Sequence, residues 1–113
     1  MTVGDLLPRL SGVVAPAGGL GADVRDRAVT AIAYDSRRAT AGAIFVAVSG
    51  QRFDGAAFAA DAIGRGAVLV VSASAPPVDG PVAWVRVEDA RLALAELAAR
   101  QAESAARQVG FAA

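Results

Sequence analysis

Two short apolar runs separated by a helical segment limit most strongly what this chain can fold into. Residues 43–48 read AIFVAV and residues 67–71 read AVLVV, each continuously apolar over the length of a strand. Such runs are typical of strands that are covered on both faces. The intervening residues 56–67, AAFAADAIGRGA, place Phe58, Ala59, Ala62 and Ile63 on one helical face and end in glycines. This order predicts a right-handed βαβ crossover with parallel strands.

Further strands are expected on both sides of this unit. Residues 28–34 (AVTAIAY) and 82–87 (VAWVRV) are mostly apolar and include β-branched side chains, which favour strands. Residues 13–14 are predicted to form a short strand inside the Gly- and Pro-rich loop of residues 11–27.

Helices are expected near both ends of the chain. Thr2 and Asp5 form a capping pair before a helix over residues 3–10, which Pro8 ends early. From Glu88 onward the sequence predicts one long helix with acidic residues in its first turn. The residues of this helix best suited to packing are Leu92, Leu94 and Leu97.

These elements predict an α/β fold. We expect a single three-layer-like domain with a mixed, mostly parallel sheet of about four to five strands flanked by helices. Residues 1–99 would form this domain. Residues 100–113 would be a helical tail or a linker, because their apolar positions are mostly alanine and bury little surface.

The composition removes several kinds of chemistry. The chain has no His and no Cys, which excludes Ser-His catalysis, imidazole metal sites and thiolate chemistry. All 11 basic residues are Arg, so there is neither a Schiff-base lysine nor a Walker A lysine. A net charge of +0 suggests no nucleic-acid partner. No apolar run reaches the roughly 18 residues of a membrane span, and no signal peptide is evident, so a cytoplasmic protein without a membrane partner is expected.

Two polar loops follow predicted strands. YDSRR occupies residues 34–38 and SGQRFDG occupies residues 49–55. Ligands of open α/β sheets bind beyond the carboxyl ends of the strands, and both loops meet at that edge if the two strands are parallel. The helix start after the second loop offers N–H groups to a phosphate. Arg37 and Arg52 add positive charge, and Phe53 offers a flat apolar face. The loops therefore suggest a shelf for an anionic ligand.

Ordinary turns are the alternative interpretation of the same residues. Asp35 and Ser36 are common turn residues that bond to their own backbone. Gly50 and Gly55 serve turns equally well, and surface arginines are commonly solvated. The residues alone leave both interpretations open.

The run DSRRATAGAIFVAVSGQRFDGAAFAADAIGRGAVLVV resembles the N-terminal domain of the Mur ligases, which build the peptide of bacterial peptidoglycan. The matching positions are Asp35-Ser36-Arg37, Ile44-Phe45-Val46-Ala47, Gly50, Asp54-Gly55, Phe58, Ala62 and Gly66-Ala67. With the later VRVEDARLALAELAA, the resemblance covers residues 29–99. It is greatest to the MurE ligases, with the MurF ligases next. The sequence departs from the family pattern where Ala41-Gly42-Ala43 replaces Pro-Gly-Asp and where Ala56 replaces a His.

The resemblance implies a substrate-recognition domain that binds the UDP part of UDP-N-acetylmuramoyl-L-alanyl-D-glutamate for ATP-dependent amino-acid addition in cell-wall synthesis. By position, the implied substrate-binding residues are Tyr34, Ser36, Gln51, Arg52 and Phe53. The implied supporting residues of the motif are Asp35, Arg37, Gly50, Asp54 and Gly55. No catalytic residue and no metal ligand is implied in this chain.

The resemblance also implies a division of labour. Family members continue into a central ATP-binding domain with a G-x-x-G-K-[ST] loop, and this sequence contains no such loop. ATP and Mg²⁺ would serve a full-length ligase, and this chain alone is expected not to catalyse ligation. Its expected partners are UDP-N-acetylmuramoyl-dipeptide and, covalently linked or not, a Mur ligase central domain. The alternative is a stand-alone binding, regulatory or docking module derived from such a domain.

Overall fold

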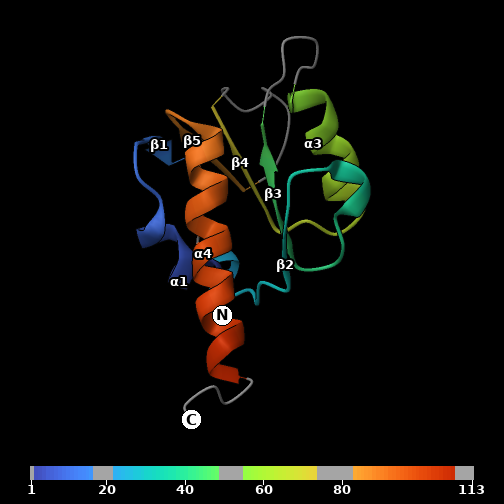
Figure 1. Cartoon of the computed structure of the whole chain (residues 1–113). Helices are drawn as coiled ribbons and strands as arrows, with labels where there is room; N and C mark the ends of the chain where they lie inside the picture. The colour runs from blue at the N-terminus through green and yellow to red at the C-terminus, as the bar shows by residue number, and fades with distance from the viewer. Residues whose placement is uncertain (1, 17–21, 49–54, 74–82, 109–113) are drawn as a thin grey trace.

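The computed structural model describes residues 2–16, 22–48, 55–73 and 83–108 (Figure 1). The elements follow one another as α1 (Val3–Leu6), the 3₁₀ helix η1 (Leu7–Arg9), β1 (Val13–Pro16), α2 (Ala22–Arg25), β2 (Ala31–Ala33), the 3₁₀ helix η2 (Ser36–Arg38), β3 (Ala43–Ala47), α3 (Gly55–Gly64), β4 (Leu69–Ser72), β5 (Trp84–Val87) and α4 (Ala90–Gln108). The predicted strands and both predicted longer helices are present, with shifts of a few residues at their ends.

The strands form one sheet in the order β1-β5-β4-β3-β2. Neighbours from β2 to β5 pair in parallel, whereas β1 pairs with β5 antiparallel. The helix α3 connects the adjacent parallel strands β3 and β4, as the predicted βαβ unit requires. The mixed, mostly parallel sheet is therefore confirmed.

Helices cover both faces of this sheet. Side chains alternate between faces along a strand, so β3 sends Ile44 and Val46 to one side and Phe45 to the other. The first side packs with Leu97 of α4 and with residues of α1 and α2. The other packs with α3, for example with Ala62. Figure 1 shows α3 and α4 separated by the sheet. The result is the expected three-layer arrangement.

The N-terminal helix forms and ends as its residues predict. Thr2 Oγ1 accepts the backbone N–H of Asp5, and the Asp5 carboxylate accepts the backbone N–H of Thr2. These bonds satisfy two of the donors that a helix start leaves free. They also lower the pKa of Asp5, chiefly through the bond with the Thr2 backbone. At Pro8 the helix continues only as the 3₁₀ turn η1.

Four local predictions were wrong. The acidic residues predicted in the first turn of the last helix lie before it, because α4 begins at Ala90 and has no acidic residue in its first turn. Residues 22–25 form α2, although the Gly- and Pro-rich stretch predicted a loop there. Leu92 is 48% exposed, because α4 faces the sheet through Ala90, Ala93 and Leu97. Phe58 is 41% exposed, whereas its predicted neighbours on the helix face are buried or partly buried. Both helices place buried alanines in the core clusters beside the sheet.

Candidate functional site

The carboxyl ends of β2 and β3 lie at the same edge of the sheet. The two strands are parallel, with Ala31 opposite Ala43 and Ala33 opposite Phe45. The chain leaves β2 into the loop at Tyr34, and it leaves β3 toward the loop that precedes α3. The two strands are therefore parallel, as the prediction of two polar loops at one edge required.

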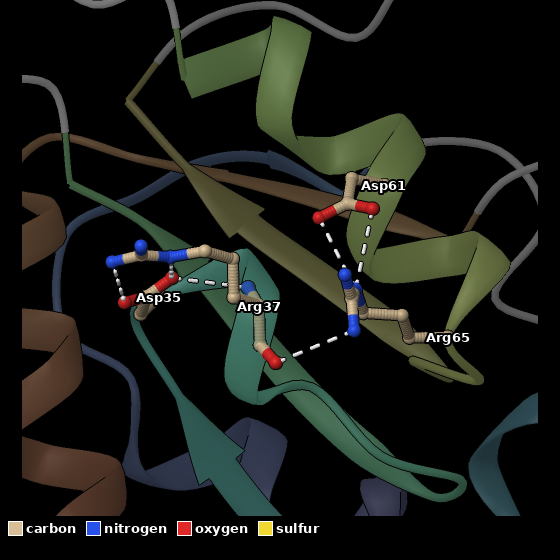
Figure 2. A network of polar contacts seen from close by, with 4 residues as sticks. All are labelled: Asp35, Arg37, Asp61 and Arg65. Atoms are coloured by element: carbon tan, nitrogen blue, oxygen red, sulfur yellow. Dashed lines mark hydrogen bonds and ion pairs between the residues drawn. The ribbon is translucent and has the colours of Figure 1, made fainter.

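The first loop is organised around the carboxylate of Asp35 (Figure 2). Its Oδ1 accepts the backbone N–H of Arg37 at 3.0 Å and the Nε–H of the same residue at 3.1 Å. Its Oδ2 accepts from Arg37 Nη2 at 2.9 Å. The backbone N–H of Arg38 donates to the Asp35 carbonyl at 2.9 Å, which closes the turn of η2. Asp35 thus begins this 3₁₀ turn as its side-chain cap.

The same contacts set the charge state of the pair. Hydrogen bonds from the Arg37 side chain, followed by that from its backbone, hold the pKa of Asp35 below its ordinary value. In return, the carboxylate raises the pKa of Arg37. Arg37 remains 80% exposed beside this partner. Asp35 makes the bond to the local backbone that the turn interpretation predicts, and Arg37 contacts Asp35 from a position open to solvent.

The other predicted site residues differ in how far the structure describes them. Tyr34 is 69% exposed at the carboxyl edge and takes no part in the core. Ser36 is the first residue of η2, where its backbone alone is described. Gly55 is the first residue of α3. The remaining predicted residues lie outside the described ranges: Gly50, Gln51, Arg52, Phe53 and Asp54.

Two residues of α3 and of the turn after it join the first loop, and the sequence analysis did not single them out. Arg65 Nε donates to both carboxylate oxygens of Asp61, at 3.2 and 3.3 Å. Arg65 Nη1 reaches the carbonyl oxygen of Arg37 at 3.5 Å. Figure 2 shows Arg65 extended between α3 and η2. The spacing of four residues between Asp61 and Arg65 signals the ion pair, but only the fold brings η2 beside it.

The Ala41-Gly42-Ala43 segment lies at the opposite edge, because β3 begins at Ala43. Gly42 has φ 85° and donates its N–H to the Gly66 carbonyl at 3.0 Å. Thr30 Oγ1 donates to the Ala41 carbonyl at 2.7 Å. The turn is thus held in place without the Pro and Asp of the family pattern, and it lies at the amino end of the strand whose carboxyl end leads to the second loop.

Some kinds of site are absent from the part of the chain that the structure describes. Across residues 2–16, 22–48, 55–73 and 83–108, no group of three or more His, Cys, Asp or Glu side chains could hold a metal ion. Within the same ranges, no helix has the length and apolar character needed to cross a bilayer.

Comparison with known proteins identifies the family. Residues 28–102 match the family described as "Mur ligase family, catalytic domain". The chain is 56% identical over 72 residues to the UDP-N-acetylmuramoyl-L-alanyl-D-glutamate--2,6-diaminopimelate ligase of Solibacter usitatus, and 43% identical over 103 residues to that of Chlorobium phaeobacteroides. These matches cover 64% and 89% of this chain but 14% and 19% of the relatives. The chain thus spans less than a fifth of their length.

A solved structure agrees with these relatives. MurF from Acinetobacter baumannii superposes with a TM-score of 0.54 at 36% identity, over 67% of this chain and 16% of that chain. The resemblance to the N-terminal domain of Mur ligases is confirmed, as is the similarity to both MurE and MurF enzymes. The chain belongs to the Mur ligase family.

Proposed function

We propose that this chain is the substrate-recognition domain of a MurE-type ligase and binds the UDP part of UDP-N-acetylmuramoyl-L-alanyl-D-glutamate. The relatives are named UDP-N-acetylmuramoyl-L-alanyl-D-glutamate--2,6-diaminopimelate ligases, and this name contains the proposed substrate. Because the chain corresponds to less than a fifth of those proteins, the domain would contribute binding, and other parts would carry out the ligation.

The observation that carries the proposal is the parallel pairing of β2 and β3. It puts the end of β2, where the Tyr34–Arg38 loop begins, and the end of β3 at one edge of the sheet, and open α/β sheets bind ligands at such an edge. A helix start carries free backbone N–H groups and a partial positive charge, and α3 begins at Gly55, at the end of the connection from β3. A pyrophosphate fits such a setting because it carries the opposite charge.

An exposed aromatic ring and hydroxyl at this edge support the nucleotide end of the proposal. Tyr34 is 69% exposed and would offer its ring to the uracil base or its hydroxyl to the ribose. We propose Ser36, Gln51, Arg52 and Phe53 as the other contacts, following the family motif. Asp35 and Arg37 would keep the first loop in shape, as their mutual hydrogen bonds suggest.

The proposed role uses binding energy far from the reacting bond. Holding the UDP end of a long substrate fixes the position of its distant carboxylate without chemistry in this domain. ATP and Mg²⁺ would act in the larger part of a full-length ligase that this sequence does not cover. The absence of Lys from the chain agrees with this division, since a P-loop requires one.

Titration of the ¹⁵N-labelled chain with UDP, and then with UDP-N-acetylmuramoyl-dipeptide, tests the proposal. We expect saturable shift changes at the amides of Ser36, Gln51, Arg52 and Phe53. Arg52→Ala should weaken binding roughly tenfold, because a charge-assisted contact to phosphate is lost. Arg91→Ala is the matched control, since it removes an exposed arginine from α4 on the other side of the sheet. Unchanged spectra at millimolar UDP-N-acetylmuramoyl-dipeptide would refute the proposal.

A further inference from the structure

The 3₁₀ turn η2 has two kinds of support, one internal and one external. Internally, the Asp35 side chain and carbonyl accept the N–H groups of Arg37 and Arg38. Externally, Arg65 donates to the Arg37 carbonyl from the far end of α3. The internal bonds fix the shape of the turn, whereas the external bond ties the turn to the end of α3.

The external support is itself held in place. Asp61 lies one helical turn before Arg65, and its two oxygens accept the Arg65 Nε–H at 3.2 and 3.3 Å. This holds the guanidinium so that Nη1 points to η2 (Figure 2). The backbone N–H of Arg65 also bonds to the Asp61 carbonyl at 3.1 Å, so the arginine is fixed at both its backbone and its side chain.

The helix α3 therefore connects the two loops of the proposed site. Its first residue, Gly55, is also the last residue of the second loop, and the arginine just beyond its last turn donates to the first loop. Ala59 and Ala62 of α3 are buried in the core cluster that also contains Ala39, directly after η2. Small side chains at this contact allow η2 to lie close enough to α3 for Arg65 to reach it.

We propose that Asp61 and Arg65 are positioning residues that hold the Tyr34–Arg38 loop in its ligand-binding place. This inference rests on the proposed function. Neither side chain needs to touch the ligand, because both act through the Arg37 carbonyl. Both are nearly half exposed, at 45% and 46%, so the contribution is that of a surface pair. We expect a loss of roughly two- to fivefold in UDP affinity when it is removed.

Two variants separate positioning from simple stabilisation of α3. Arg65→Gln removes the ion pair and weakens the contact with η2. The double exchange Asp61→Arg with Arg65→Asp keeps an ion pair between the same two positions but places a carboxylate, which can only accept, next to the Arg37 carbonyl. If the pair only stabilises the helix, the exchanged protein should bind UDP as the wild type does. If it positions η2, the exchange should lose at least as much affinity as Arg65→Gln.

Amide hydrogen exchange provides a measurement that needs no ligand. In both variants, exchange at the Arg37 and Arg38 amides should accelerate severalfold, while the amides of β3 and β4 stay protected. Arg91→Gln on α4 is the control and should change neither exchange nor affinity.

The outcomes distinguish this inference from the proposed function. If both variants bind UDP with wild-type affinity, and amide exchange at residues 37 and 38 is unchanged, the positioning role alone is overturned. A wild type that binds no nucleotide overturns the proposed function, and the positioning role in recognition with it. Selective exchange at η2 together with the affinity loss in both variants supports the inference.

Discussion

Substituting Gly66 tests how the turn after α3 fits against the turn before β3. Gly66 has φ +109°, a backbone conformation that other residues avoid. A Cβ added there would lie 2.6 Å from the Cα and 3.0 Å from the N of Ala41. Carbon atoms prefer about 3.5–4.0 Å, so the backbone must move by roughly 1 Å. That movement would also strain the bond from the Gly42 N–H to the Gly66 carbonyl, which is 3.0 Å long.

We therefore expect Gly66→Ala to lower the free energy of unfolding by about 1–4 kcal/mol. Strain at the positive φ contributes about 1–3 kcal/mol, and the weakened hydrogen bond about 1 kcal/mol. Loss of unfolded-state entropy offsets up to about 1 kcal/mol of this. In a domain of this size the melting temperature should fall by roughly 4 °C or more.

Gly64→Ala is the matched control, two residues earlier in the chain. Gly64 is the last residue of α3, and an added Cβ there meets no heavy atom within 4 Å. This substitution should leave stability unchanged or raise it by up to about 1 kcal/mol, since alanine favours the helix. Urea unfolding followed by circular dichroism measures both variants. A Gly66→Ala protein within about 0.5 kcal/mol of the wild type would refute the reasoning from Cβ contacts.

Three further predictions concern the core, the N-terminal cap and pH. Leu97→Ala should cost about 2–5 kcal/mol because Leu97 is 0% exposed, whereas Leu92→Ala should cost under about 1 kcal/mol at 48% exposure; equal losses in urea unfolding would contradict the orientation of α4. Thr2→Ala should lower the free energy of unfolding by about 0.5–2 kcal/mol, because it removes the side-chain acceptor of the capping box. An unchanged melting curve would show that the cap does not stabilise the fold. Folding lowers the pKa of Asp35, so the contribution of its ion pair is fully present above the unfolded pKa of about 3.9 and is lost as pH falls through the lower folded pKa. An NMR titration of the Asp35 carboxyl carbon should therefore show a midpoint below that of Asp35 in the urea-unfolded chain, and an equal or higher midpoint would contradict the role of Arg37.

Local sequence features determined much of the fold because their physical causes are local. The continuously apolar run of β3 required cover on both faces, and the helical period of residues 56–67 required a crossover to a parallel strand. The capping pair Thr2 and Asp5 defined a helix start through contacts three residues apart. The family motif likewise depends on the order of residues in the chain, so the sequence sufficed to indicate a Mur ligase domain.

Only the tertiary structure decided which side chains share a surface. The period of α4 allows several leucine positions to face inward. Packing of the helix on the sheet buries Leu97 and leaves Leu92 at the surface. The contact between Arg65 and η2 joins residues 28 positions apart, and it exists because buried alanines let α3 lie beside that turn. Sequence patterns report periodicity along one element, whereas this part of the candidate site depends on the distance between elements, which packing alone sets.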